Sequence, residues 1–314
     1  MRPREELITI RDNEKLIRRF LMDLILTPRI KALEWSLLTK QTPNLKIGYP
    51  GQHLASLVVG MEGAKTGARG NDIVDGSEVK SCSRIDQVDT CKDCDEKVLR
   101  IESRCSCCGS TNIARKNDSK WLFAIRNEND LRILTQEVER IILTIADYPD
   151  FEQRDFNTIR FQVFEIWTKS PRCQAFKTLL DDYYFNIYQT HRRINPNKIP
   201  APKNFWPYSF QFYMCNPIKV FSCDVLNANS NPEIHISHYV EPHIDRSNLE
   251  SEKMPVSVLT SKEAEAVATS LNISVNDLKK IGFVDEKMRE SIPLRNVGRI
   301  AISKKPYRRR KPNV

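Results

Sequence analysis

The sequence predicts an α/β protein that carries a cysteine-rich insertion and a mainly helical C-terminal unit. Helical and extended patterns alternate over the first half of the chain, an order typical of a sheet flanked by helices. Five of the nine cysteines crowd between Cys91 and Cys108, and helical patterns return after residue 256. A chain of 314 residues can bury a large core and form two or three structural units.

The composition is that of an ordinary soluble protein, with 40% hydrophobic and 28% charged residues. The longest apolar stretch, residues 54–61, is far shorter than the roughly 20 residues of a membrane-spanning helix. The charged N-terminus has no apolar signal region behind it, so we expect a cytoplasmic protein without a membrane partner. The net charge of +9 favours a polyanionic partner such as DNA.

Helices are expected at the start of the chain. Apolar residues recur at helical spacing over residues 13–26, and the pattern resumes over 30–38 after an interruption at Pro28. The sequence Gly-Tyr-Pro-Gly at 48–51 predicts a turn, and residues 53–61 a further helix. Glycines at positions 60, 63, 67 and 70 predict a flexible segment that leads into the next strand.

A tight hairpin is expected next. Residues 71–74 and 77–81 have extended character, and Asp75-Gly76 between them is typical of a turn. Side chains alternate faces along a strand, so Glu78 and Lys80 share one face. Asp72 joins them only if residues 74–76 form a three-residue loop with Gly76 in the left-handed conformation. A two-residue turn would put Asp72 on the opposite face.

Asp72, Glu78 and Lys80 form the candidate catalytic set. Two facing carboxylates repel each other unless a cation lies between them, and Mg²⁺ prefers carboxylate oxygens while keeping several waters. Lys80 would hold or deprotonate an attacking water and balance the charge on a phosphate. The pattern predicts Mg²⁺-dependent phosphodiester hydrolysis, with Asp72, Glu78 and the backbone carbonyl of Val79 as metal ligands.

Alternatives stay open at this hairpin. Glu78 and Lys80 could be solvated side chains of an ordinary surface hairpin. Asp75 competes with Asp72 as the first metal ligand, although a turn position suits it better. Glu62, near the end of the preceding helix, could reach the metal from the helix side.

The cysteines form a C-x2-C-x10-C-x2-C pattern made by Cys91, Cys94, Cys105 and Cys108. Two such turns each aim a pair of thiolates inward, and together they make a closed tetrahedral zinc site with a structural role. Cys107 could replace Cys108, although Cys108-Gly109 fits the usual turn better. The remaining cysteines, at 82, 173, 215 and 223, are expected to be buried thiols.

Beyond the cysteines, residues 120–126 predict a strand, and a helix capped by Asn129 or Asp130 is expected to run through Ile145. Another helix is expected over 170–191, with strands over 209–214 and 218–225. Polar residues from 242 onward indicate a linker to the C-terminal unit.

The C-terminal unit predicts a helical pair. Thr260 and Glu263 fit a capping box, and Ser274 caps a second helix. If the pair is a DNA-binding helix-turn-helix, its groove contacts are expected from four residues of the second helix: Val275, Asn276, Lys279 and Lys280. A plain helical hairpin is the alternative. The chain ends in a basic run at 304–311.

Several stretches together carry a family resemblance: Gly-Tyr-Pro-Gly-Gln-His-Leu-Ala-Ser-Leu from residue 48, Thr-Gly-Ala-Arg-Gly-Asn-Asp from 66, Asp-Gly-Ser-Glu-Val-Lys-Ser-Cys-Ser-Arg from 75, the paired cysteine motifs, and Asp-Ser-Lys-Trp-Leu-Phe-Ala-Ile-Arg from 118. They resemble the PD-(D/E)xK nuclease superfamily and, more narrowly, the MamI family of Type II restriction endonucleases. Asn71 stands where the superfamily motif has Pro, which leaves the role of Asp72 intact.

The resemblance implies a mixed sheet flanked by helices, Mg²⁺-dependent cleavage of double-stranded DNA leaving 5′-phosphates, and a homodimer that reads a palindrome. The family's namesake reads GAT, four unspecified bases, then ATC. A methyltransferase is expected as a functional but not a physical partner in the host.

The expected domain organisation is a nuclease domain over 1–241 with the zinc ribbon inserted at about 88–113, a linker over 242–255, and a DNA-contacting helical unit over 256–314. Two other functions fit parts of the sequence. A zinc-ribbon DNA-binding regulator would leave the Asp72–Lys80 hairpin unexplained, and a structure-specific repair nuclease would share the active site but not the substrate.

Overall fold

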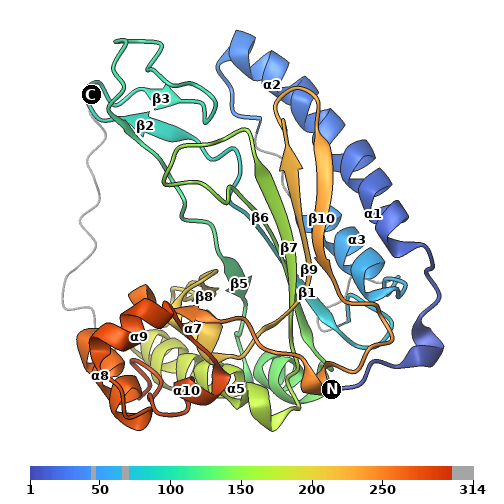
Figure 1. Ribbon diagram of the computed structural model, residues 1–314, viewed down its shortest axis with the longest axis vertical. Helices are drawn as coiled ribbons and strands as arrows, with labels where there is room; N and C mark the ends of the chain where they lie inside the picture. Colours follow the sequence, from blue (N-terminus) through green and yellow to red (C-terminus); the bar gives the residue numbers. More distant parts are fainter. Residues whose placement is uncertain (44–46, 66–70, 299–314) are drawn as a thin grey trace.

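The computed structural model describes residues 1–43, 47–65 and 71–298. Its centre is a five-stranded sheet in the order β1-β6-β7-β9-β10 (Figure 1). Strand β1 runs parallel to β6, and the other neighbours are antiparallel, so the sheet is mixed. The strands are β1 (Glu78–Ser83), β6 (Ile141–Asp147), β7 (Ile159–Ile166), β9 (Ile218–Leu226) and β10 (Glu233–Tyr239). The predicted α/β class, with a mixed sheet flanked by helices, is confirmed.

Three smaller sheets surround the central one. They comprise β2 (Asp89–Cys91), β3 (Lys97–Val98) and β4 (Ile113–Ala114); β5 (Trp121–Phe123) and β8 (Lys203–Phe205); and β11 (Met254–Pro255) and β12 (Phe283–Val284). The first of them forms the cysteine-rich insertion.

The α-helices are α1 (Asn13–Leu21), α2 (Thr27–Thr39), α3 (Gly48–Val59), α4 (Glu128–Arg132), α5 (Gln174–Asp182), α6 (Gln189–Ile194), α7 (Phe210–Met214), α8 (Ser261–Ser270), α9 (Val275–Ile281) and α10 (Glu286–Arg289). Shorter 3₁₀ or π turns are η1 (Glu5–Leu7), η2 (Met22–Leu26), η3 (Ile133–Glu137), η4 (Pro171–Cys173), η5 (Tyr183–Tyr188), η6 (Arg246–Asn248) and η7 (Val256–Val258).

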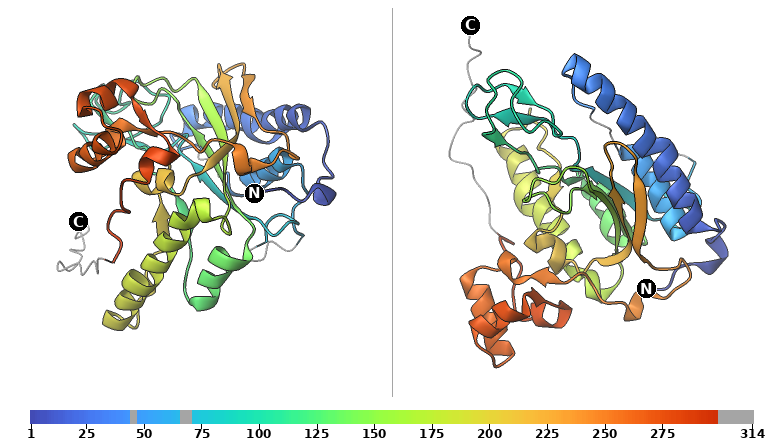
Figure 2. Two further views of the ribbon diagram at one scale, coloured as in Figure 1. Left: turned by 60° about the horizontal axis from the view of Figure 1, so that its bottom comes forward. Right: turned by 45° about the horizontal axis from the view of Figure 1, so that its top comes forward.

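Helices α1, α2 and α3 lie along one side of the central sheet (Figures 1 and 2). Helix α3 approaches β1 and β6 most closely at Gly51, where a Cβ atom would lie only 2.0 Å from the Ser81 hydroxyl oxygen. On the other face, aromatic side chains from β5, β7, β8 and α7 interlock: Trp121, Phe123, Phe164, Phe205 and Phe212. Burial on both faces fixes the strand that bears Glu78 and Lys80.

The predicted N-terminal helices are confirmed, with two corrections. Pro28 does not interrupt the helix, because it occupies the first turn of α2, where proline needs no hydrogen-bond donor, and the π segment η2 joins α2 to α1. The predicted turn at 48–51 is instead the first turn of α3. The predictions for Gly67, Gly70 and the basic run 304–311 fall outside the described residues, as do residues 66–70 of the quoted motif.

Two predicted elements after the cysteines were wrong. The helix expected from Asn129 or Asp130 begins after the Asn127 cap and ends by Glu137, and Ile141–Asp147 is strand β6, buried along its whole length. A strand buried on both faces is apolar throughout, and its pattern resembles that of a buried helix. Residues 210–214, expected as a strand, form helix α7. The helix over 170–191 and the strand over 218–225 are confirmed in η4–α6 and β9.

The C-terminal helices α8 and α9 have the predicted caps. The Thr260 and Glu263 capping box is present, and the Ser274 side chain accepts from the N–H of Asp277. Ala264, Val267 and Leu278 belong to the same hydrophobic core as the central sheet. Within the described residues, no helix has the length and apolar character needed to cross a membrane.

Candidate functional site

The turn before β1 has the expected three-residue loop. The N–H of Gly76 donates to the carbonyl of Ile73 (2.9 Å), and the N–H of Ile73 donates to the carbonyl of Ser77 (3.1 Å). Gly76 has a φ of 87°, in the left-handed region that favours glycine. Residues 71–74 do not form a strand, however, and Ile73 instead makes an isolated bridge with Gly63.

Asp72 lies at the free edge of β1 in the described sheet. Its Oδ2 accepts from the backbone N–H of Val79 (2.8 Å), and its Oδ1 accepts from Nε2 of Gln52 on α3 (2.9 Å). Burial raises the pKa of Asp72 above its usual value, while the Val79 N–H lowers it. The charge of Glu78 raises the pKa further and that of Lys80 lowers it, so the three charges lie close enough to interact.

Glu78 and Lys80 form an ion pair on one face of β1. They line a cavity of about 130 Å³ together with apolar side chains of β5 and η3 and with the carboxylate of Asp130. The Glu78 side chain is 9% exposed and that of Lys80 is 23% exposed. The reading of this hairpin as an ordinary solvated surface feature therefore does not fit its burial.

The metal-ligand set predicted from the sequence consists of Asp72, Glu78 and the Val79 carbonyl. In a strand, the N–H and C=O of one residue point to the same side. Because the Val79 N–H reaches Asp72, the Val79 carbonyl also faces the free edge of β1. Carboxylate and carbonyl oxygens are ligands that suit Mg²⁺, so the donor set fits the expected ion.

Asp75 has a different role from Asp72. Its Oδ2 accepts from the Arg140 guanidinium (2.9 Å) and its Oδ1 from the N–H of Ser77 (3.0 Å). Arg140 is fully buried and also pairs with Glu165 (2.8 Å). Burial lowers the pKa of Arg140, but the charges of Glu165 and Asp75 outweigh this and raise it, so Arg140 remains a cation that holds the turn.

Glu62 offers less to the site than Asp72. Its backbone carbonyl accepts from the N–H of Val74 (3.1 Å), which helps to place the turn. Its side chain is exposed and lines a groove that also contains Asp72.

Three neighbours of the site were missed from the sequence: Gln52, Asp130 and Arg140. Gln52 lay between the turn expected at 48–51 and the helix expected over 53–61, so no helix face pointed it towards Asp72. Asp130 and Arg140 fell into a helix that was predicted too long. Only the pairing of distant elements brings them to the hairpin.

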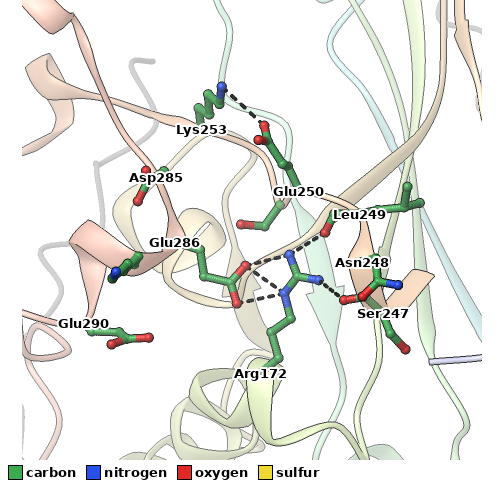
Figure 3. A pocket seen from close by; sticks show the side chains of 11 residues that line it. Arg172, Ser247, Asn248, Leu249, Glu250, Lys253, Asp285, Glu286 and Glu290 are labelled. Atoms are coloured by element: carbon green, nitrogen blue, oxygen red, sulfur yellow. Dashed lines mark hydrogen bonds and ion pairs between the residues drawn. The ribbon is translucent and has the colours of Figure 1, made fainter. Parts of the chain in front are cut away.

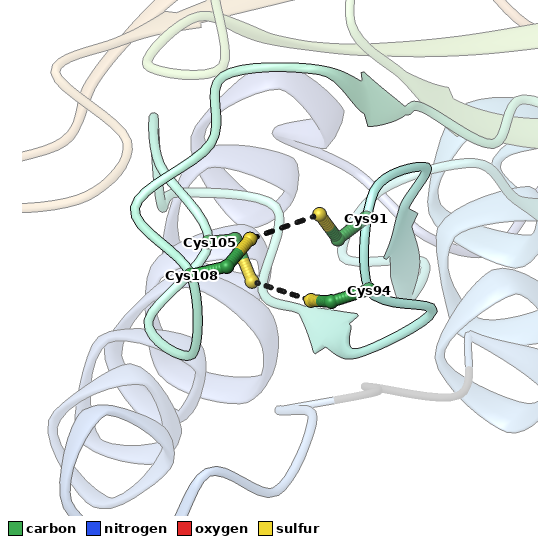
Figure 4. A group of neighbouring side chains, drawn as sticks. All are labelled: Cys91, Cys94, Cys105 and Cys108. Atoms are coloured by element: carbon green, nitrogen blue, oxygen red, sulfur yellow. Dashed lines mark hydrogen bonds between the residues drawn. The ribbon is translucent and has the colours of Figure 1, made fainter.

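The four predicted zinc ligands lie together (Figure 4). Ligand atoms of Cys91, Cys94, Cys105 and Cys108 are within 4.8 Å of one another. Backbone N–H groups of Cys108 and Cys107 face the Cys105 sulfur and lower the pKa of its thiol to about 7. Four convergent thiols are a donor set that suits zinc. Cys107 is exposed and outside this cluster.

The cysteine-rich segment is anchored to the rest of the protein beneath the four-thiol cluster. Buried Asp89 accepts from Arg100 (2.9 Å) and Arg115 (2.8 Å). The Arg100 guanidinium packs against the rings of Tyr148, Phe151 and Phe156, with centroid distances of 4.9–5.7 Å. The remaining cysteines at 82, 173, 215 and 223 are buried as predicted, and burial raises the pKa of Cys82 to about 11.

The predicted DNA-reading residues lie on α9. Asn276, Lys279 and Lys280 are exposed, and Val275 is half-buried. Lys280 pairs with Asp277 on the same helix (3.0 Å). This exposure is compatible with both the helix-turn-helix and the plain helical hairpin.

A larger hollow of about 530 Å³ lies between η6, the following loop and α10 (Figure 3). Arg172 spans it and binds Glu286 (2.7 Å) and the carbonyl of Leu249 (2.6 Å). Among its described lining residues, none belongs to the predicted sites. Its interactions instead tie α10 and the loop after η6 to η4, the turn that follows β7.

The fold and the two clusters define a mixed α/β protein with a carboxylate–lysine site and a separate four-cysteine site. A family model described as MamI restriction endonuclease matches residues 34–257, more than two thirds of the chain. The chain belongs to this family.

One relative is the Type II restriction enzyme MamI of Microbacterium ammoniaphilum, 36% identical over 74 residues. The match covers 24% of this chain and 24% of the relative, so it spans about a quarter of that enzyme's length. No solved structure matches the chain.

Proposed function

We propose that this protein is a Type II restriction endonuclease with a PD-(D/E)xK core, and that it hydrolyses both strands of double-stranded DNA at an interrupted palindrome. Membership of the MamI family supports DNA cleavage. The observation that carries the catalytic assignment is the placing of Asp72, Glu78 and Lys80 around one sheet edge, with their charges interacting.

Asp72, Glu78 and the Val79 carbonyl are the proposed holders of Mg²⁺. When bound there, the ion would polarise the phosphate and lower the pKa of a water. Asp72 is already oriented by Val79 and Gln52, which fixes the direction of its free lone pairs.

Lys80 would act on the attacking water and on the phosphate. Its ammonium group pairs with Glu78 and lies 6.0 Å from the centre of the Phe123 ring, in a cavity with apolar walls. A cation in such surroundings interacts strongly with developing negative charge because little water screens it. In-line attack of the water on phosphorus would break the P–O3′ bond, with the 3′ oxygen leaving and taking up a proton, and so leave 5′-phosphate and 3′-hydroxyl ends.

The four-cysteine cluster is proposed to hold a structural Zn²⁺. Four cysteines close a tetrahedral site and leave no position for substrate. The segment is therefore assigned to stability rather than to catalysis.

The test is incubation of the purified protein with plasmid DNA and Mg²⁺. We expect discrete fragments with 5′-phosphates, and no cutting by Asp72→Ala, Glu78→Ala or Lys80→Ala, each of which should still bind DNA in Ca²⁺. Glu233→Ala is the matched control, because Glu233 is an exposed acid on β10, the opposite edge strand.

Each outcome has a clear meaning. Substantial cutting by the Glu78 variant would refute the catalytic set. DNA binding without any cleavage would favour a zinc-ribbon regulator, and cleavage confined to branched or mismatched DNA would favour a repair nuclease.

A further inference from the structure

A group of basic and aromatic side chains gathers at the start of β5. We call it the β5 cluster, and it consists of Arg84, Lys120, Arg160, Trp206 and Tyr208. Nε of Arg84 donates to the carbonyl of Ser119 (3.2 Å), and the Lys120 ammonium lies 4.3 Å from the centre of the Trp206 ring. The guanidinium carbons of Arg84 and Arg160 lie 5.8 and 5.7 Å from the centre of the Tyr208 ring. These contacts bring together segments that are far apart in the chain.

The β5 cluster lies on the same face of the central sheet as Lys80. Side chains alternate along a strand, so Lys80 and Arg84, four residues apart, point to one face. The N–H of Arg84 donates to the carbonyl of Ala146 (2.8 Å), which continues the pairing of β1 with β6. Strand β5 has Phe123 beside the Lys80 ammonium at its end and Ser119 beside Arg84 just before its start. At roughly 3.3 Å per residue, Arg84 is therefore about 13 Å from Lys80 along β1.

Two of the three cations in the β5 cluster have no acidic partner. Arg160 donates two hydrogen bonds to the Asp147 carboxylate, at 3.1 and 2.9 Å, and lies opposite Asp224 of β9. In the described part of the chain, Arg84 contacts a carbonyl and a ring, Lys120 contacts a ring, and neither forms an ion pair. The β5 cluster therefore carries two unmatched positive charges.

The burial of Arg84 makes its lack of an acidic partner informative. Its residue is only 8% exposed. A buried charge is costly unless it is paired, and one carbonyl and one aromatic ring offset only part of that cost. The two terminal nitrogens of Arg84 bind no oxygen of the described residues, yet neither is sealed from solvent. An anion at this position would accept their hydrogen bonds and neutralise the charge.

The aromatic members hold the cations in place. Trp206 is 37% exposed and supports Lys120 beside the paired strands β5 and β8. Tyr208 has a φ of 58°, a left-handed conformation that is rare for a bulky side chain and is found where a structure needs a fixed geometry. Its hydroxyl donates to Oδ2 of Asp147 (2.8 Å). The ring that contacts Arg84 and Arg160 is thereby fixed.

We propose that the β5 cluster is a phosphate-binding site for the backbone of double-stranded DNA, separate from the catalytic residues. The proposal rests on the proposed function, because it places the duplex by the phosphate that is cut near Lys80. Phosphates recur every 3.4 Å of axis on each strand, so a duplex cut there has further phosphates about 13 Å away. A free phosphate could not contact both places.

The residue types suit this role. A guanidinium group can bind two oxygens of one phosphate, and an ammonium group binds phosphate as a point charge. Contacts of this kind fix the position of a duplex without reading its sequence. The Arg160 side chain is 27% exposed and lines an open hollow of about 480 Å³ on the same face of the sheet, so this side of the β5 cluster is accessible.

The test measures DNA affinity by fluorescence anisotropy in Ca²⁺ over a range of salt concentrations. Two labelled duplexes are compared, one that spans a cleavage site mapped on the plasmid and one without a site. Lys120→Ala should lower the slope of log affinity against log salt by about 0.9 and weaken binding about 8-fold at 0.1 M salt, equally for both duplexes. The cleavage rate at saturating DNA should stay close to that of the wild type.

Arg84→Met tests the second cation. Methionine keeps an apolar stem of similar length against Tyr208, while the charge is removed. We expect the same loss of about 0.9 in slope, and about 1.8 when Arg84→Met and Lys120→Ala are combined. The thermal melting temperature shows whether the Arg84 variant is folded; if it is not, the half-buried Lys120 decides the proposal alone.

Lys253→Ala is the matched control. The Lys253 ammonium also lies over an aromatic ring, 4.7 Å from the centre of Phe283, but it is paired with Glu250 (3.3 Å). A lysine whose charge is already matched contributes little to phosphate binding. This variant should keep the slope of the wild type.

An unchanged slope in Lys120→Ala would overturn the proposed site. It would also be overturned if inorganic phosphate raised the melting temperature of the wild type, but not of Lys120→Ala, while the DNA slope stayed the same, because the β5 cluster would then bind a free phosphate. A reduced slope in a protein that cuts no DNA would support the site and refute the proposed function. Cleavage with an unchanged slope would do the reverse.

Discussion

Asp72 and Asp75 lie three residues apart in the same turn, yet their carboxylates have different surroundings. Both oxygens of Asp75 are engaged inside the protein, by Arg140 and by the N–H of Ser77. Asp72 instead faces the free edge of β1 and lines an open groove. Removing Asp75 would leave the buried Arg140 with only one of its two carboxylate partners, Glu165. We therefore expect the loss of Asp75 to lower the stability of the fold rather than to remove a metal ligand.

At the same scale, Gln52 is expected to position Asp72. Loss of a side chain that orients a metal ligand typically weakens metal binding or activity by about 10- to 100-fold. We therefore expect Gln52→Ala to raise the Mg²⁺ concentration for half-maximal cleavage by about 10-fold. The rate at saturating Mg²⁺ should change little, and a metal titration of cleavage measures both quantities.

The pH profile of the same variant separates positioning from a general structural effect. An N–H that donates to a carboxylate favours its charged form, so removing the Gln52 amide should raise the pKa of Asp72 further. A protonated carboxylate does not bind the metal, and the acid limb of the cleavage profile should move to higher pH. Ser56→Ala, one turn along α3, is the control; an unchanged profile and metal titration in Gln52→Ala would contradict the role.

At the scale of elements, the cysteine-rich segment joins β1 directly to the region around β5. Its base is fixed by the Asp89, Arg100 and Arg115 network and by the aromatic rings beneath Arg100. Its own hydrophobic cluster consists only of Cys91, Val98, Cys105 and Ile113. Such a small cluster buries little apolar surface, so we expect the proposed zinc to contribute much of the folding free energy of the segment.

Replacing Cys91, Cys94, Cys105 or Cys108 by Ser should remove one zinc per chain and unfold the segment, because isolated zinc modules gain roughly 10 kcal/mol or more from the metal. Cys107→Ser is the matched control and should keep its zinc, since Cys107 lies outside the cluster. Elemental analysis of the purified variants measures this. Full zinc occupancy in the Cys105 variant, or none in the wild type, would show that the ligand set is wrong.

At the scale of the whole molecule, the cysteine-rich segment and the C-terminal helices lie at opposite ends of the longest axis (Figure 1). The C-terminal helices share their core with the sheet and are fixed by buried Arg289, which donates to Ser251 (2.6 Å) and Asn216 (2.9 Å). We therefore propose that the described part of the C-terminal unit, residues 256–298, acts as an integral DNA-contacting part of the nuclease rather than as a mobile module.

Lys279 and Lys280 test this role. If both contact phosphates, Lys279→Ala combined with Lys280→Ala should weaken DNA binding and lower the slope of log affinity against log salt by about 0.9 per contact. Binding measured in Ca²⁺ over a range of salt concentrations gives this slope, and Lys262→Ala, on α8, is the control. An unchanged slope would favour the plain helical hairpin.

Local chemistry made several features predictable from the sequence. The loop at Gly76, the helix caps at Thr260 and Ser274, and the four-cysteine cluster depend on residues close in the chain and on strict spacing. Strand β6 was not predictable in this way, because a strand buried on both faces lacks the alternation that identifies an exposed one.

By itself, the sequence determined the three-residue loop at Gly76, the strand with Glu78 and Lys80 on one face, the paired cysteine turns and the mixed α/β class. Only the tertiary structure decided that Asp75 anchors the turn and that Gln52 orients Asp72, because Arg140 lies 65 residues from Asp75 and Gln52 lies 20 residues from Asp72. Contacts of this kind depend on how helices and strands pack. Such long-range contacts leave no periodic pattern in the sequence, because the residue that contacts a site can belong to any helix or strand that packs against it.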